Sequence, residues 1–161
     1  MNNNNNSNLQ DNNTPGSRIA INAQYVKDLS FESPNAPQSL VGIKTAPKID
    51  LKLDLAATPL SETTFEIALT IKAAADTEEQ NLFLVELCYA GVFTLENVPA
   101  EQQEFLLLAY CPSLLFPFAR RVIADATRDG GFQPLMIDPI DFAVLYAQRK
   151  QEATEQKELA D

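Results

Sequence analysis

The residues that could do chemistry in this chain are mainly carboxylates, because its 161 residues include no histidine and only two cysteines, Cys88 and Cys111. Without histidine, the sequence excludes Cys–His and Ser–His nucleophile pairs and His-ligated zinc or haem. Two cysteines do not complete a four-cysteine zinc site, and none of the five glycines lies in a phosphate-loop pattern. Carboxylate chemistry stays open, but the sequence favours a protein that is not an enzyme and needs no metal or cofactor.

The overall charge limits the partners. A net charge of −10 disfavours nucleic acids and anionic membranes, since binding to phosphates depends on Lys and Arg. No uninterrupted apolar run approaches the roughly 18 residues of a membrane span. Residues 1–8 carry neither the basic nor the apolar region of a secretory signal. We therefore expect a cytoplasmic protein with reduced cysteines and no insertion into a membrane.

Four segments alternate between apolar and polar residues with the period of two that is typical of strands: about 19–31, 49–55, 65–72 and 81–93. The first segment divides into an apolar face and a face that carries the acids. The apolar face is expected to hold Ile19, Ile21, Ala23, Tyr25, Leu29 and Phe31, and the other face Val26, Asp28, Ser30 and Glu32. The fourth segment is apolar on both faces, with Leu84 and Glu86 opposite Val85, Leu87 and Tyr89. Such a strand needs a covering surface or a partner on each face.

The pattern becomes helical after Pro99 and predicts one long helix that stops near Gly130 and Gly131. An extended apolar link over 132–137 leads to a short second helix over 141–146, which Asp138 or Asp141 could cap. Four strands followed by two helices indicate an α+β fold, with strands two to four in an antiparallel meander. We expect one domain over residues 18–150, between an Asn-rich disordered tail (1–17) and an acidic tail (151–161).

Two stretches of the chain carry a resemblance to a known family. Residues 109–121 read Ala-Tyr-Cys-Pro-Ser-Leu-Leu-Phe-Pro-Phe-Ala-Arg-Arg, and residues 27–37 read Lys-Asp-Leu-Ser-Phe-Glu-Ser-Pro-Asn-Ala-Pro. Residues 109–121 resemble the first helix of SecB, the bacterial protein-export chaperone, and residues 27–37 resemble its first strand and the loop that follows. The resemblance covers roughly residues 19–149. It implies a homotetramer, a dimer of dimers, that holds unfolded pre-secretory proteins without ATP and delivers them to the SecA motor.

The resemblance also implies site residues. Asp28, Glu32, Leu84 and Glu86 match the positions by which the family docks on SecA, whose basic tail holds its own zinc. Without the resemblance, these four residues read as part of a solvated sheet face. Val85, Leu87 and Tyr89 read as core, and match positions that influence oligomerisation, although Tyr89 departs from the small polar residue expected there.

The family binds clients in a long apolar groove lined by the loop after the first strand, the second helix and the link between the helices. Residues that could line it are Leu40, Val41, Ile43, Phe116, Phe118, Leu135, Ile137, Phe142 and Tyr146. Most of them would be core in any helix-on-sheet fold, and a subset is expected to face clients. Two alternatives stay open. One is a SecB-like chaperone dedicated to an antitoxin, and the other is a small-ligand binder or carboxylate enzyme, which predicts a closed pocket instead of an open trough.

Overall fold

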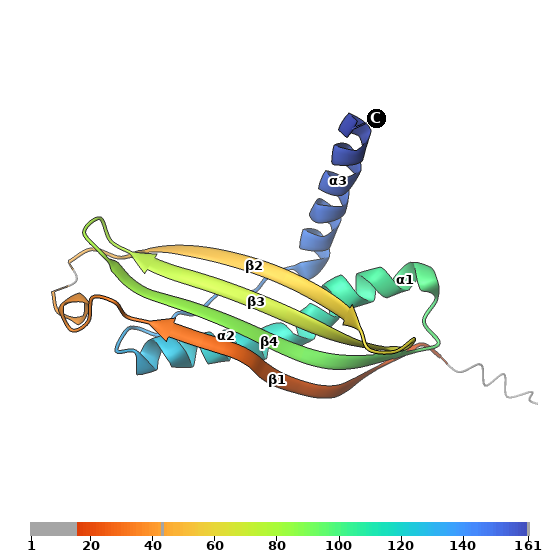
Figure 1. Cartoon of the computed structure of the whole chain (residues 1–161), viewed down its shortest axis with the longest axis horizontal. Coiled ribbons are helices and arrows are strands. Elements are labelled where there is room, and N and C mark those ends of the chain that lie inside the picture. Colours follow the sequence, from red (N-terminus) through yellow and green to blue (C-terminus); the bar gives the residue numbers. More distant parts are fainter. Residues whose placement is uncertain (1–15, 43, 161) are drawn as a thin grey trace, which may run out of the picture.

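The computed structural model describes residues 16–42 and 44–160. Its strands β1 (Arg18–Glu32), β2 (Lys48–Pro59), β3 (Thr64–Asp76) and β4 (Asn81–Glu96) form one antiparallel sheet in the order β1-β4-β3-β2 (Figure 1). The predicted meander of the last three strands is confirmed, and β1 pairs with β4 at the open edge. The connection from β1 to β2 therefore crosses one end of the sheet, and it contains the short helix η1 (Gln38–Leu40). The predicted tail over residues 1–17 lies almost entirely outside the described residues.

The face assignment of β1 is corrected in its middle. Asn22 and Lys27 have no partner in the β1–β4 register, so each is a bulge that shifts the alternation by one residue. Between the two bulges Tyr25 lies opposite Ala90 on the outer face, and Val26 lies opposite Tyr89 on the face toward the helices. The second bulge restores the original phase, so Asp28, Ser30 and Glu32 share one face as expected. The predicted faces of Ala23, Tyr25 and Val26 are therefore wrong, because a strict period of two allows for no extra residue.

One continuous helical segment covers the inner face of the sheet, which is the face opposite the acids of β1. It consists of α1 (Ala100–Phe105), the π-helical turn η2 (Leu106–Tyr110) and α2 (Cys111–Asp129). Pro112 lacks an N–H, and its ring would collide with the carbonyl four residues earlier, so the wider π turn just before it relieves that conflict. The side chains buried against the sheet include Leu107, Cys111, Leu115, Ala119 and Ile123.

By length and composition alone, the segment Ala100–Asp129 could cross a membrane. It was not predicted as a candidate span, because polar residues interrupt its apolar runs. Its position explains the composition. It packs on β4 and β3, and residues such as Leu115, Ala119 and Ile123 are fully buried there. The helix thus forms one of the two layers that enclose the domain core, which is what a core helix in a sheet-based domain does.

The second helix, α3 (Phe142–Ala160), is 19 residues long, so the expected short helix is wrong. Asp141 caps it, since its Oδ1 accepts hydrogen bonds from the N–H groups of Ala143 and Val144 at 3.1 Å. The residues taken for an acidic tail continue the helix as far as Ala160. They are mostly Ala, Gln, Glu and Lys, which are strong helix formers without an apolar period to reveal them. In Figure 1, α3 projects away from the body of the domain.

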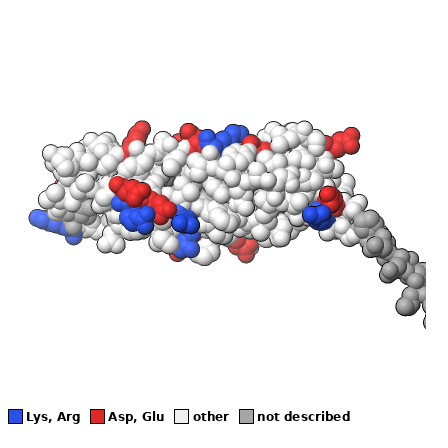
Figure 2. All heavy atoms as spheres, turned by 90° about the horizontal axis from the view of Figure 1, so that it is seen from below, with Lys and Arg blue, Asp and Glu red and all other residues white. Residues whose placement is uncertain are grey.

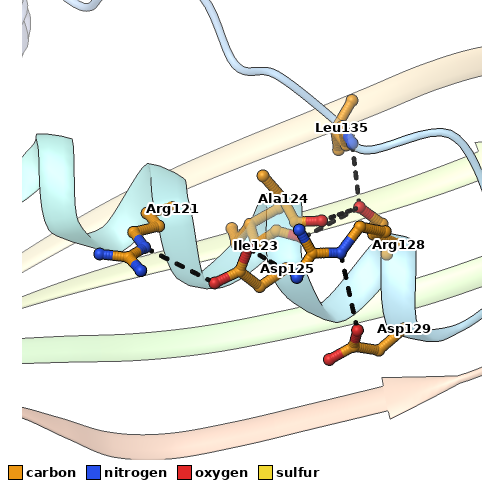
Figure 3. Close-up of polar contacts among 8 residues, drawn as sticks. Arg121, Ile123, Ala124, Asp125, Arg128, Asp129 and Leu135 are labelled. Carbon is orange, nitrogen blue, oxygen red and sulfur yellow. Dashed lines mark hydrogen bonds and ion pairs between the residues drawn. The ribbon is translucent and has the colours of Figure 1, made fainter.

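A buried threonine ties the link between the helices to the end of α2. Thr127 is fully buried; its hydroxyl donates to the carbonyls of Ile123 and Ala124 at 3.0 Å and accepts from the N–H of Leu135 at 2.9 Å (Figure 3). The nearby Arg121, Asp125 and Arg128 form exposed ion pairs at 3.3–3.7 Å. The buried hydroxyl of Thr127 therefore fixes where the link leaves α2.

Candidate docking face and client trough

Three of the four predicted SecA-docking residues meet in one shallow depression on the outer face of the sheet. Glu32, Leu84 and Glu86 line this depression of about 280 Å³. Glu32 lies directly opposite Leu84 in the β1–β4 register, and Asp28 lies opposite Cys88, two residues beyond Glu86. Leu84 is 42% exposed, which is unusual for a leucine in a central strand. We call these four residues the docking face; they combine carboxylates with one exposed apolar side chain, which lies at one end of the group beside Glu32.

The structure adds two cations that the sequence analysis did not assign to this face. Glu86, Lys72 and Lys52 form a row across β4, β3 and β2. The Nζ of Lys72 lies 3.6 Å from Oε1 of Glu86, and both lysines line the same depression. Side-chain exposures of 57% and 46% make this a surface pair of modest strength. The alternation of apolar and polar residues in β3 predicts that Lys72 lies on the outer face of the sheet. Its pairing with Glu86 could not be predicted, because it depends on the register between β3 and β4.

Further along the outer face, Glu66 on β3 bridges to two residues of β1. The hydroxyl of Tyr25 donates to its carboxylate, and the Nζ of Lys27 lies 2.7 Å from Oε1. The hydrogen bonds from Lys27 and Tyr25 lower the pKa of Glu66. The same contact with Glu66 raises the pKa of Tyr25 to about 12. This cluster joins the edge strand to the centre of the sheet across β4.

On the other side of the domain, two open depressions meet at Ile140. The first, of about 380 Å³, lies between β2 and the link; its lining is apolar except for Asp138 and consists of Ile49, Leu51, Leu135, Met136, Ile137, Asp138, Pro139 and Ile140. The second, of about 330 Å³, lies between η2 and the start of α3, and is lined by Phe105, Tyr110, Ile140 and Phe142 among others. The two share Ile140 and are open to solvent. We call this surface the apolar trough.

Four of the predicted groove residues lie at the trough or beside it. Leu135, Ile137 and Phe142 line it, although Ile137 and Phe142 are only 5% and 2% exposed and form its floor. Tyr146 lies in an adjoining cavity of about 420 Å³ at the root of α3, and its ring packs edge-on against Phe105 at 5.5 Å.

The other predicted groove residues are scattered. Phe116 is buried and packs against Phe142 at 5.9 Å, so the structure places it in the core. Phe118 is half exposed on a different side of α2, where it stacks on Tyr89 at 6.4 Å. Leu40 packs toward Gly131, at the end of α2, and Val41 is 77% exposed in the crossing loop. Ile43 lies outside the described residues. The described lining residues of the trough therefore come from β2, the helical segment, the link and the start of α3, and not from the crossing loop.

Val85, Leu87 and Tyr89, the predicted oligomer-interface residues, are buried on the inner face of their own sheet. Val85 and Leu87 are fully covered within the single chain, which matches the core alternative and leaves no surface for direct contact with a second copy.

Burial raises the pKa of Cys111 to about 12, so this cysteine is a packed apolar side chain and not a reactive thiol.

The exposed large apolar residues that line the trough were not predicted; they are Ile49, Leu51, Phe105, Tyr110 and Met136. A signal was available. Strands lie about 4.8 Å apart and a helix is about 10–12 Å across, so one helix covers only two or three of four strands. The regular apolar face of residues 49–55 therefore had to be left partly open at the sheet edge.

Comparison with known proteins agrees with this architecture. A family model described as the preprotein translocase subunit SecB matches residues 10–153. The protein-export protein SecB of Rickettsia bellii is 55% identical over 135 residues, which span 83% of this chain and 89% of that protein. The SecB of Rickettsia felis is 54% identical over the same share of each chain.

Among solved structures, the following one is similar in fold. It is a SecB-like chaperone of Mycobacterium tuberculosis in complex with an antitoxin peptide, with a TM-score of 0.63 at 16% identity over 76% of this chain and 91% of that one. At 16% identity this structure shows a likeness in fold alone. The family model and the relatives that are more than half identical match this chain in sequence. On these matches, the chain belongs to the SecB family of protein-export chaperones.

Proposed function

We propose that the chain holds unfolded pre-secretory proteins in the cytoplasm in an export-competent state and delivers them to the SecA motor. The observation that carries this proposal is the separation of two surfaces on one rigid sheet. The apolar trough lies beside the link and β2, and the docking face lies on the outer face near β1 and β4. A client in the trough would leave the docking face free, so client and motor could be bound at the same time.

The trough suits unfolded chains of many sequences. Each apolar side chain that it buries contributes about 1.5–3 kcal/mol, which alone gives a weak contact. Several such contacts along one trough act together, because later contacts form within an existing complex. Apolar burial has no directional requirement, so the trough would accept varied clients, and folding would compete by burying the same client residues.

The docking face suits a basic partner. Its carboxylates would attract cations at long range, and Leu84 would add an apolar contact beside Glu32. We assign this partner as the basic tail of SecA. The antitoxin-dedicated alternative has support only from a likeness in fold, whereas the relatives that are more than half identical are protein-export proteins.

We further propose that four copies assemble as a dimer of dimers. Ile21, Val26 and Leu29 of edge strand β1 are 42–45% exposed on the inner face, and Phe118 of α2 is 51% exposed. Figure 2 shows the molecule from below the view of Figure 1, the side on which β1 lies, and an uncharged area in the middle of this face lies between charged groups toward its edges and ends. A long edge strand next to uncovered apolar residues is a surface that a second copy would cover.

The docking assignment is tested with purified SecA and an unfolded precursor. Glu86→Lys, or Asp28→Ala with Glu32→Ala, should weaken SecA binding and leave precursor binding unchanged. Glu79→Lys, in the turn between β3 and β4, makes the same change of charge away from the docking face and serves as the control. Equal SecA affinities for Glu86→Lys, Glu79→Lys and the wild type at low and moderate salt would refute the docking assignment.

A further inference from the structure

The second bulge of β1 decides on which face the docking acids of this strand lie. Lys27 has no partner in the β1–β4 register, whereas Val26 and Asp28 on either side of it pair with β4. Without this extra residue, the alternation that starts at Tyr25 would turn Asp28 to the inner face, because a shift of one residue reverses every side chain that follows. The acids of β1 therefore face a partner only as long as the bulge keeps its place.

Glu66 of β3 holds this bulge through two residues of β1. Its carboxylate accepts a hydrogen bond from the hydroxyl of Tyr25, before the bulge, and its Oε1 lies 2.7 Å from the Nζ of Lys27, the bulged residue itself. Both side chains reach Glu66 across β4, where the residue opposite Tyr25 is the small Ala90. A bulge interrupts the backbone ladder, so these side-chain contacts fix β1 where its pairing is weakest.

Asp28 follows the bulge directly and depends on it for its direction. It is exposed, and none of the ion pairs in the described part of the chain involves it. Glu66 differs in both respects. Its side chain is only 16% exposed, and both of its carboxylate oxygens already accept hydrogen bonds, from Tyr25 and Lys27. Glu66 therefore suits a supporting role, while Asp28 suits direct contact with a partner.

We propose that Glu66 is a positioning residue for docking: with Tyr25 and Lys27 it holds the bulge of β1, so that Asp28 is directed at a basic partner before that partner arrives. The inference rests on the proposed delivery to SecA and deepens it by adding a group that sets the docking geometry without belonging to the docking face. A carboxylate that is already in place costs less conformational entropy on binding than one that is ordered only on contact. Loosening the bulge should therefore weaken docking although no docking residue is changed.

The test measures binding to purified SecA and, separately, to an unfolded precursor, well below the melting temperature. Tyr25→Phe removes one contact of Glu66 without a change of charge, and should weaken SecA binding about two- to five-fold, as expected for one partly exposed contact. Lys27→Gln makes the chain more acidic, so attraction of a basic partner alone would tighten binding, whereas loss of the bulge contact should weaken it. Lys27→Arg keeps a cation for Glu66 and should bind SecA as the wild type does. Precursor binding should be unchanged in all three variants.

The control is Lys150→Gln on α3, which makes the same change of charge away from β1 and should not weaken SecA binding. Asp28→Asn should weaken SecA binding by itself, and Tyr25→Phe or Lys27→Gln should cause no further loss beside it, because they act through Asp28. Wild-type SecA affinity in Tyr25→Phe and Lys27→Gln, losses that persist beside Asp28→Asn, or equal losses of SecA and precursor binding would overturn this inference and leave the docking assignment standing. Unchanged SecA binding by Asp28→Asn itself would count against the docking assignment.

Discussion

Glu66 is the residue on which the outer face of the sheet depends most, since its carboxylate receives hydrogen bonds from Tyr25 and Lys27 across the intervening strand β4. We expect Glu66→Gln to lower the melting temperature by a few degrees at neutral pH, because the amide cannot form the charged contact with Lys27. Thermal unfolding followed by circular dichroism measures this. Glu62→Gln, in the exposed turn before β3, is the control and should have little effect.

The pH dependence of this difference follows from the lowered pKa of Glu66. A carboxyl whose folded pKa lies below its unfolded value of 4.5 stabilises the fold above that value, and the contribution is lost as pH falls through the folded pKa. The gap in melting temperature between wild type and Glu66→Gln should be constant from about pH 5.5 to 8 and shrink below about pH 4.5. A gap that is unchanged well below that pH would contradict the assigned role.

At this scale, the sequence predicted which residues share a face wherever the alternation is regular. Asp28 and Glu32 follow the second bulge of β1 and were placed correctly relative to each other. Tyr25 was not, because the extra residues Asn22 and Lys27 leave no mark in the pattern. Its contact with Glu66 depends on which strands are neighbours and in which register, and neither is written in the local sequence.

At the scale of elements, the position of the trough depends on Thr127, which ties the link to α2. We expect Thr127→Val to destabilise the domain by about 1–3 kcal/mol, because the shape is kept while the buried N–H of Leu135 loses its acceptor. Urea unfolding measures the loss, and hydrogen exchange should show faster exchange over residues 132–140. Thr154→Val removes an exposed hydroxyl on α3 and should change the stability little. Equal stabilities of both variants would show that Thr127 does not hold the link.

The elements themselves were largely predictable, and the exceptions share a cause. The four strands and the long helix have strong periodic patterns, and the structure confirms them to within a few residues at most ends. The length of α3 was missed because residues 147–160 are all exposed and carry no apolar period. Helix propensity forms this segment without packing on its own domain, so a search for amphipathic patterns does not find it.

At the scale of the whole molecule, assembly is the first expectation to test. The uncovered apolar residues of β1 and α2 should be buried between copies, so light scattering at micromolar concentration should give a mass near four times 17.8 kDa. Replacing Val26 and Leu29 by Thr keeps strand propensity and removes apolar contact, so it should lower the mass. A monomer at physiological salt for the wild-type protein would contradict the proposed assembly.

The distribution of the apolar residues over core and trough could not be read from the sequence. Phe116 and Met136 both follow apolar patterns, yet Phe116 is buried and Met136 is 57% exposed. The difference arises because one helix covers only the middle of a four-stranded sheet and leaves the apolar face of β2 to the link. Placement of this kind depends on how the layers meet, which is a property of the whole fold.

The proposal that clients are held in the trough is tested most directly by comparing trough variants in a refolding assay. Leu51→Thr/Met136→Ser removes exposed apolar contact from the trough, and Leu60→Ser/Leu159→Ser does the same at exposed positions elsewhere. If the trough binds clients, the first variant should largely lose the ability to delay the refolding of a slow-folding precursor, since each lost contact costs about 1–3 kcal/mol. Its melting temperature should stay unchanged, and the second variant should delay refolding as the wild type does. An equal delay by all three proteins would contradict the proposal that clients are held in the trough.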